Sequence, residues 1–123
     1  MPSVLICDDA RFMRTVIGQV LGQYGFTVVG EADSGPRAVE RYFALRPDLV
    51  TMDIVMPELD GIAAIRQIME RDPTARIVVC TAVGQDKHVA ESVAAGAKAF
   101  LVKPFKPAQL MDAVDRALAT NPR

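Results

Sequence analysis

The sequence predicts an α/β protein with a doubly wound, five-stranded parallel sheet of strand order 2-1-3-4-5 and five helices. Short apolar runs alternate with longer amphipathic stretches, which is the pattern of repeated βα units. In chain order the runs are Val4–Cys7, Thr27–Ala32, Leu49–Met52, Ile77–Cys80 and Ala99–Val102. The second run is the least apolar, so we place it at a sheet edge, and right-handed crossovers then favour the stated order.

The first two helices are predicted from apolar residues at helical spacing and from the signals at their ends. Gly25 stands where a left-handed residue ends the first helix, Ser34 can cap the second, and Pro47 stops it. The inward-facing residues are expected to be Met13, Val16, Ile17, Val20, Leu21 and Tyr24 in the first helix and Ala38, Val39, Tyr42 and Phe43 in the second.

Three more helices follow the third, fourth and fifth runs. Asp60 or Gly61 opens the third helix, and Pro107 fits the first turn of the fifth. The fourth, over 86–95, is rich in alanine, so we expect it to be the most loosely packed, and we expect 121–123 to fray. The larger apolar residues are Ile62, Ile65, Ile68 and Met69 in the third helix, Val89 and Val93 in the fourth, and Leu110, Val114 and Leu118 in the fifth.

Length and composition limit the possible functions. A chain of 123 residues, half of them apolar, is expected to form one domain, 1–123, with no output domain. A net charge of −1 with scattered Lys and Arg argues against direct binding of nucleic acid. No apolar stretch approaches the roughly 20 residues that cross a bilayer, and no leader segment is apparent. We therefore expect a cytoplasmic protein that does not act on membranes.

Acidic residues follow two of the predicted strands. Asp8 and Asp9 end the first run, and Asp53 ends the third. If these strands are neighbours in a parallel sheet, their carboxyl ends share the edge at which open α/β sheets build their sites. Three close carboxylates repel one another unless a cation lies among them, and oxygen ligands of this kind suit Mg²⁺. The sequence therefore predicts a magnesium site for phosphate chemistry.

Two further polar residues are predicted at the same edge: Thr81 follows the fourth run and Lys103 the fifth. A carboxylate such as Asp53 can attack phosphorus, while a lysine and a hydroxyl can hold phosphoryl oxygens. Each residue alone has an ordinary interpretation, since Asp9 can cap the first helix, Thr81 can be a loop residue and Lys103 can be solvated. The functional interpretation depends on finding suitable side chains at successive strand ends.

Taken together, these motifs closely resemble the receiver domain of two-component response regulators, which has a flavodoxin-like fold. The matching motifs are Asp8-Asp9, Asp53 with Met56-Pro57 and Asp60-Gly61, Thr81-Ala82, and Lys103-Pro104-Phe105. The resemblance covers essentially the whole chain. It implies that Asp53 accepts a phosphoryl group from a phosphohistidine on a sensor histidine kinase or phosphotransfer protein. No enzymatic activity beyond self-phosphorylation and self-dephosphorylation is implied.

The resemblance also implies specific roles for the other residues of the site. Mg²⁺ is expected to be bound by Asp9, Asp53 and the main-chain carbonyl of Val55, with Asp8 supporting it through water. Lys103 and Thr81 are expected to contact the phosphoryl group. The Lys103-Pro104 peptide is expected to be cis.

A switch is implied as well, in which Thr81 moves toward the phosphoryl group and Phe100 turns inward. Phe100 lacks the hydroxyl of a tyrosine, so switching here would depend on packing; an ordinary core phenylalanine is the other interpretation. The face that changes is expected to comprise the fourth helix, the fifth strand and the fifth helix, roughly 83–95, 97–102 and 105–118.

Val55 and Val83 are apolar where many receivers carry polar or acidic residues. With no side chain there to orient a water, we expect slow self-hydrolysis of the phosphorylated form and a possible requirement for an external phosphatase.

The predicted last helix ends close to the end of the sequence, as in stand-alone chemotaxis receivers that act on the flagellar motor switch. A phosphorelay intermediate and the excised receiver of a larger transcriptional regulator remain alternatives. From other classes, a haloacid dehalogenase-type phosphatase needs a second Asp where Val55 stands, and a flavodoxin would bind the phosphate of FMN where Asp8 and Asp9 would repel it. Cys7 and Cys80 are interpreted as buried apolar residues, and His88 as a solvated surface residue.

Overall fold

The computed structural model describes residues 1–119, so the expected fraying of 121–123 lies outside the described residues. The elements, in chain order, are β1 (Ser3–Cys7), α1 (Arg11–Gln23), β2 (Thr27–Ala32), α2 (Gly35–Leu45), β3 (Leu49–Met52), α3 (Gly61–Arg71), β4 (Ile77–Thr81), α4 (Asp86–Ala95), β5 (Ala99–Val102) and α5 (Pro107–Ala119). Two strands differ slightly from expectation, since β1 begins one residue earlier and β4 ends one residue later. Across residues 1–119, no helix is both long enough and apolar enough to span a membrane.

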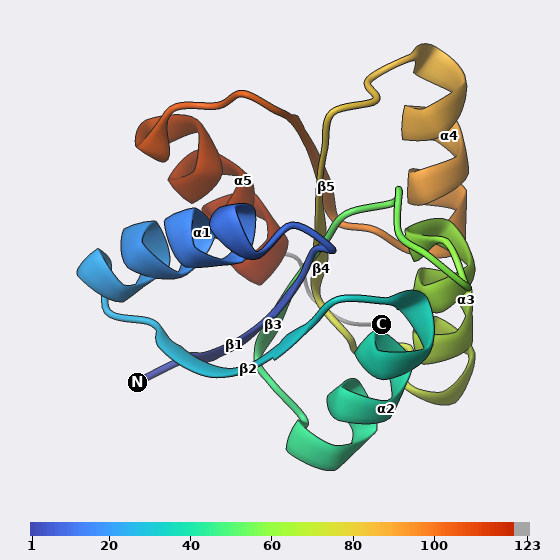
Figure 1. Cartoon of the computed structure of the whole chain (residues 1–123), viewed down its shortest axis with the longest axis horizontal. Helices are drawn as coiled ribbons and strands as arrows, with labels where there is room; N and C mark the ends of the chain where they lie inside the picture. Colours follow the sequence, from blue (N-terminus) through green and yellow to red (C-terminus); the bar gives the residue numbers. More distant parts are fainter. Residues whose placement is uncertain (120–123) are drawn as a thin grey trace.

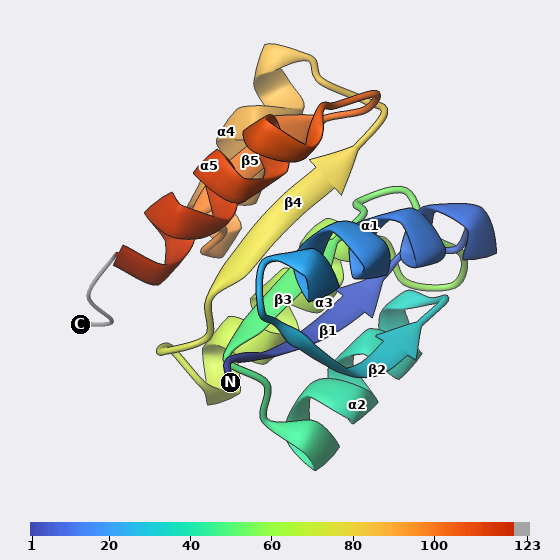
Figure 2. The same cartoon turned by 90° about the vertical axis from the view of Figure 1, so that its left-hand side faces the viewer.

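The five strands form one sheet in the order β2-β1-β3-β4-β5, and every neighbouring pair is parallel. Figure 1 views the sheet nearly edge-on, with α1 and α5 on one side and α2, α3 and α4 on the other. Figure 2, turned by 90°, shows α1 and α5 lying along the strands that they cover. The predicted doubly wound architecture is therefore confirmed.

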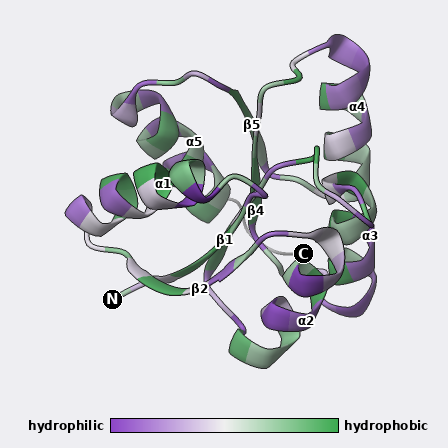
Figure 3. Ribbon diagram, in the orientation of Figure 1, coloured by the Kyte–Doolittle hydropathy of each residue, from purple (hydrophilic) through white to green (hydrophobic). Residues whose placement is uncertain are grey.

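The core consists of two apolar layers, one on each face of the sheet. Successive residues of β1 alternate between them: Val4 and Ile6 pack with α1 and α5, whereas Leu5 and Cys7 pack with α2 and α3. Because β1, β3 and β4 have helices on both faces, their apolar residues are almost wholly buried, and Figure 3 shows the hydrophobic colour concentrated along the strands. The second cysteine, Cys80, lies in the layer of α1 and α5, so both cysteines are buried as expected.

Most of the predicted helix ends are confirmed by their hydrogen bonds. The Ser34 side chain accepts from the Arg37 N–H at 3.4 Å, and the Asp60 side chain accepts from the Ala63 N–H at 2.9 Å. Gly25 has a φ of 92°, as expected for a residue just beyond a helix end. Tyr24 does not face inward, because it is the C-terminal cap of α1 and is 54 % exposed.

Gly61 places α3 directly against the end of β3. A Cβ atom at this position would lie 2.2 Å from the Asp53 carbonyl oxygen and 2.5 Å from the Ile54 Cα, so no larger residue fits without moving the backbone. The Gly61 N–H donates to the Ile54 carbonyl at 3.0 Å. The start of α3 therefore fixes the main chain of the segment that carries Asp53.

The fourth helix is attached to the rest of the molecule by small residues. Its buried positions are Ser92 and Ala95, and Val93, one of its two valines, is 58 % exposed. Little apolar area is thus buried beneath α4, in agreement with the loose packing expected from its composition.

Candidate functional site

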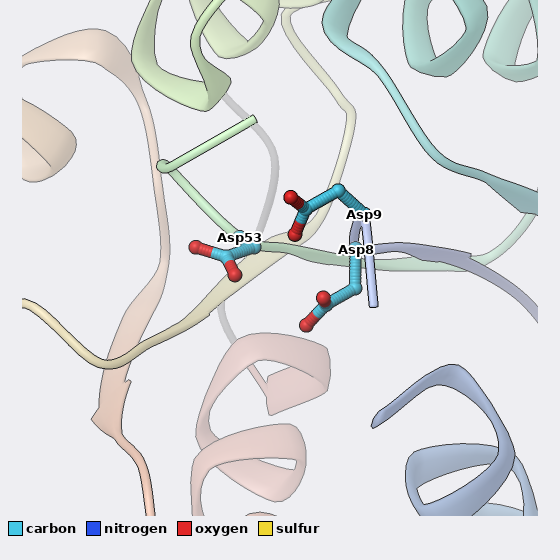
Figure 4. A group of neighbouring side chains, drawn as sticks. All are labelled: Asp8, Asp9 and Asp53. Atoms are coloured by element: carbon cyan, nitrogen blue, oxygen red, sulfur yellow. The ribbon is translucent and has the colours of Figure 1, made fainter. Parts of the chain in front are cut away.

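Three carboxylates meet where β1 and β3 end. Because β1 and β3 are adjacent and parallel, Asp8 and Asp53 each follow the last residue of a strand at the same edge, and the Asp53 N–H donates to the Cys7 carbonyl at 2.9 Å. Asp8, Asp9 and Asp53 each offer an oxygen, and these oxygens all lie within 4.8 Å of one another. Figure 4 shows the three side chains gathered at this edge of the sheet. The predicted convergence of the acidic residues is confirmed.

Asp8 is buried, and both its main-chain N–H and its carboxylate are held by hydrogen bonds. Its N–H donates to the Ala32 carbonyl at the end of β2, at 2.9 Å, and its Oδ1 accepts from the Ala10 N–H at 2.9 Å. Its other oxygen, Oδ2, accepts from Lys103 Nζ at 2.5 Å. Burial raises the pKa of Asp8 above its ordinary value, although the hydrogen bonds from Lys103 and Ala10 oppose that rise.

Lys103 connects two of the carboxylates. Its Nζ donates to Asp8 Oδ2 and, at 2.9 Å, to Asp53 Oδ2, and its side chain is only 14 % exposed. Burial works against the charged ammonium, but the hydrogen bonds to Asp8 and Asp53 outweigh it and raise the pKa of Lys103. The lysine is therefore a fixed, charged group in the site and is not solvated.

Asp53 lies at the centre of the strand ends and is 6 % exposed. Its Oδ1 accepts from the Val55 N–H at 2.9 Å, and its Oδ2 from Lys103. The Val55 peptide thus lies beside Asp53, with the Val55 side chain 54 % exposed. Both carboxylate oxygens are therefore oriented by a donor.

Asp9 does not cap α1, so the ordinary interpretation of this residue as a helix cap does not hold. The cap position is Ala10, which has no side-chain hydrogen bond to the helix, and Asp9 lies within the short turn that the bond from the Ala10 N–H to the Asp8 side chain closes. Within residues 1–119, no donor binds the exposed Asp9 carboxylate. Its oxygens are therefore available to a cation.

The donor set fits a hard divalent metal. When all three carboxylates are ionised, the single ammonium of Lys103 leaves two negative charges uncompensated in a partly buried site. Carboxylate oxygens at mutual distances below 4.8 Å are suitable ligands for Mg²⁺, and no soft sulfur or imidazole ligand belongs to the group.

Thr81 and Phe100 lie on the two strands beyond β3. Thr81 is the last residue of β4, is fully buried, and accepts from the Val83 N–H through Oγ1 at 3.4 Å. The Lys103 N–H donates to the Thr81 carbonyl at 2.8 Å, but within 1–119 no hydrogen bond joins the Thr81 hydroxyl to the carboxylates or to the Lys103 ammonium. Phe100, paired with Val79 on β4, is half-buried on the same face of the sheet as Thr81, against the layer of α2, α3 and α4.

Two residues near the site differ from the sequence interpretation. Arg14, which the sequence analysis did not single out, donates to the main-chain carbonyl of Asp8 at 2.7 Å. His88 is not simply solvated: it is half-buried, and its Nδ1 has no partner among residues 1–119. The sequence places the cation Arg14 shortly after an acid pair, but this position alone does not indicate which groups its side chain reaches.

Comparison with known proteins agrees with this geometry. The family described as the response regulator receiver domain matches residues 4–115. The chain is 51 % identical to the chemotaxis protein CheY of Thermotoga maritima over 113 residues, covering 92 % of this chain and 94 % of the relative. It is 50 % identical to the CheY of Bacillus subtilis over 115 residues, covering 94 % and 96 % of the two chains.

A solved structure is similar over nearly the whole length. A chain of the CheX–CheY–BeF3–Mg²⁺ complex from Borrelia burgdorferi superimposes with a TM-score of 0.92 at 35 % identity, covering 96 % of this chain and 90 % of that chain. Sequence, fold and the grouping of acidic residues lead to the same conclusion: this chain belongs to the response regulator receiver domain family.

Proposed function

We propose that the chain is a phosphorylation-dependent signalling switch, with Asp53 as the residue that accepts the phosphoryl group. The observation that carries the proposal is the placement of Asp53 beside both Lys103 and the acid pair, at the carboxyl edge of the sheet. The donor would be a phosphohistidine on a sensor histidine kinase or a phosphotransfer protein.

In the proposed transfer, a carboxylate oxygen of Asp53 attacks the phosphorus of the phosphohistidine. The P–N bond breaks as the new P–O bond forms, the imidazole leaves with the bonding electron pair, and Asp53 becomes an acyl phosphate. Lys103 already lies 2.9 Å from Asp53 Oδ2, so its ammonium is placed to neutralise a phosphoryl oxygen as the group arrives. Thr81, at the end of the adjacent strand β4, is the hydroxyl expected to bind a second oxygen.

Asp9, Asp53 and the main-chain carbonyl of Val55 would hold Mg²⁺, with Asp8 acting through a water molecule. The ion would neutralise negative charge on the phosphoryl group and hold it in line with the carboxylate. Support comes from the two uncompensated negative charges of the site and from the related Borrelia complex, which contains CheY together with Mg²⁺ and BeF3.

The output is proposed to involve the face formed by α4, β5 and α5. Thr81 and Phe100 lie on the same face of adjacent strands, so a movement of Thr81 would open space that Phe100 can fill. Since α4 is fixed mainly through Ser92 and Ala95, a small free-energy difference can redistribute its positions; about 1.4 kcal/mol changes a two-state population tenfold.

The most similar relatives described above suggest chemotaxis, with a flagellar motor switch protein as the downstream partner. A single-domain phosphorelay intermediate and the receiver of a larger transcriptional regulator are the other readings of the same site. Several expectations from the sequence stay predictions. They are a single domain over 1–123, no enzymatic activity on other substrates, no binding of nucleic acid or membrane, and a cytoplasmic location. A haloacid dehalogenase-type phosphatase is disfavoured because Val55 stands where its second Asp is needed.

We further propose that the phosphorylated form hydrolyses slowly. Val55 is 54 % exposed and Val83 is half-buried beside the site, and neither can orient an attacking water. An external phosphatase would then be required to end the signal. A phosphoryl lifetime of seconds in the isolated protein would contradict this.

The proposed function is tested with a small acyl phosphate donor. Incubation with acetyl phosphate and Mg²⁺ should add a single phosphoryl group, detected by intact-mass spectrometry, and addition of EDTA should prevent it. Peptide mapping should locate the group on Asp53. Phosphorylation at another residue, or none, would overturn the proposal.

A further inference from the structure

Arg14 contacts the acid pair through the main chain and not through a carboxylate. From one turn into α1, its Nη1 donates to the carbonyl oxygen of Asp8 at 2.7 Å, and its Nε donates to Glu31 Oε1 on β2 at 2.7 Å. The Arg14 side chain is only 15 % exposed, whereas that of Glu31 is 49 % exposed. The planar guanidinium therefore joins the edge strand to the loop between β1 and α1 in a fixed orientation.

The carbonyl that Arg14 holds belongs to the peptide unit between Asp8 and Asp9. The orientation of this unit determines the direction in which the Asp9 side chain leaves the backbone. Asp9 itself has no hydrogen-bond donor within residues 1–119, so its placement depends on the main chain. On the other side of Asp8, the N–H is fixed by the Ala32 carbonyl at 2.9 Å. Arg14 thus completes the restraint on the segment that presents Asp9.

A second arginine holds the partner of Arg14 in a similar way. Arg41, on α2, donates to the main-chain carbonyl of Glu31. The connection from α2 to the acid pair therefore runs through Arg41, Glu31 and Arg14 and ends at the Asp8 carbonyl. Such outer contacts orient the ligands of metal sites and commonly change metal affinity when they are removed.

We infer that Arg14 is a positioning residue for the metal site, which aligns Asp9 for Mg²⁺ by holding the Asp8–Asp9 peptide. The inference rests on the proposed function, since it concerns the ion that the acidic group is proposed to bind. The direction in which Mg²⁺ affinity changes when Arg14 is replaced distinguishes positioning from simple electrostatics. Removing a positive charge close to three carboxylates should by itself strengthen the attraction for a cation, whereas loss of positioning should weaken binding.

The test compares Mg²⁺ affinity, measured by isothermal titration calorimetry, in the wild type, Arg14→Gln, Arg14→Lys and Arg37→Gln. Arg37→Gln is the matched control: Arg37 is paired with Asp33 at 3.8 Å in the same region, is 60 % exposed, and does not contact Asp8. We expect Arg14→Gln to weaken Mg²⁺ binding about tenfold. Arg14→Lys should be weakened less, because an ammonium retains the charge but not the two-pronged geometry, and Arg37→Gln should bind as tightly as the wild type or more tightly.

A readout that does not use the metal accompanies the titration. In ¹⁵N-labelled, metal-free protein, Arg14→Gln should shift the Asp9 amide resonance, since that N–H belongs to the peptide unit that Arg14 holds, and Arg37→Gln should not. Urea unfolding in EDTA identifies any general loss of stability. Unchanged or tighter Mg²⁺ binding by a folded Arg14→Gln protein, with wild-type binding intact, would overturn the inference alone. Absence of saturable Mg²⁺ binding in the wild type would overturn the proposed function with it.

Discussion

Charged side chains cluster at both ends of the sheet, but they are balanced at one end and not at the other. At the amino end, an amino-edge cluster comprises Tyr42, Arg46, Asp72 and Thr74. Asp72 Oδ2 accepts from the Tyr42 hydroxyl at 2.6 Å and from Arg46 at 3.0 Å, while its Oδ1 accepts from the N–H and hydroxyl of Thr74 at 3.1 and 2.6 Å. Every lone-pair direction of this single carboxylate has a donor.

At the carboxyl end, three carboxylates lie together, but Lys103 is bonded to only two of them, and Asp9 has no donor among residues 1–119. The pKa values of one carboxylate at each end show the same contrast. Hydrogen bonds from Thr74 and Tyr42 hold the pKa of Asp72 below its ordinary value, whereas burial raises the pKa of Asp8. A satisfied carboxylate stabilises the fold, and an incompletely satisfied group leaves room for a ligand at some expense in stability. The first two predictions below compare a change at one end with a matched change at the other, and the last two each concern one end.

The largest expected difference concerns phosphorylation. Asp53→Asn should abolish incorporation from acetyl phosphate completely, because an amide cannot form the acyl phosphate. Asp72→Asn, the same chemical change at the amino end, should leave incorporation at the wild-type level. Intact-mass spectrometry in the presence of Mg²⁺ measures both, and incorporation by the Asp53→Asn protein would contradict the assignment.

The second difference concerns the two cations. Lys103→Met should lower the free energy of unfolding of the metal-free protein by about 3 kcal/mol, because it leaves two buried carboxylates without their partner. Arg46, whose side chain is 60 % exposed, pairs with Asp72 at the surface, so Arg46→Met should lower it by less than about 1 kcal/mol. Urea denaturation in EDTA measures both. Added Mg²⁺ should narrow the gap between Lys103→Met and the wild type and leave the gap between Arg46→Met and the wild type unchanged; equal losses in the two variants would argue against a special electrostatic role for Lys103.

The third prediction concerns the buried hydroxyl at the amino end. Tyr42→Phe removes a donor to the charged Asp72 and should lower the free energy of unfolding by about 1.5 kcal/mol.

Because the folded-state pKa of Asp72 lies below its unfolded value, the stability from this carboxylate is present above about pH 4 and is lost as the pH falls through the folded pKa. The stability difference between wild type and Asp72→Asn should therefore shrink in acid; a constant difference between pH 7 and pH 3 would refute this account.

The smallest expected change is in the stability of Asp9→Asn. Removing one of three mutually repelling carboxylates should raise the free energy of unfolding of the metal-free protein by up to about 0.5 kcal/mol. Wild-type protein should gain stability with Mg²⁺ according to its affinity, and Asp9→Asn should gain much less. Thermal unfolding with and without Mg²⁺ gives both quantities. A full Mg²⁺ response in Asp9→Asn would remove this residue from the proposed ligand set.

The sequence predicted the fold well because its signals were local and agreed with one another. Apolar runs marked the strands, and caps such as Ser34 and Asp60 marked the helices. The grouping of the acidic residues also followed, since strand order alone brings the ends of β1 and β3 together. By contrast, the sequence left open whether Asp9 caps α1, because the answer depends on the exact residue at which the helix starts, which sequence patterns locate poorly.

The contacts that the sequence could not provide are those between side chains and distant main-chain groups. Nothing in the spacing of Arg14 predicts that it reaches the Asp8 carbonyl and Glu31 together. Likewise, Lys103 was expected to contact the phosphoryl group, and the sequence did not show that its ammonium is bonded to two carboxylates in the unphosphorylated protein. Both arrangements depend on rotamers and on helix placement to within about an ångström, which are set by the packing of the whole domain.

The burial of the two cysteines has a practical consequence for observing the proposed switch in solution. Burial raises the pKa of the Cys80 thiol to about 12 and raises that of Cys7 as well, so neither forms an appreciable amount of thiolate near neutral pH. Maleimide and nitroxide reagents require a reachable thiolate. A single cysteine introduced at the exposed Val93 position of α4 should therefore take up a fluorophore or spin label selectively, with the native thiols left in place.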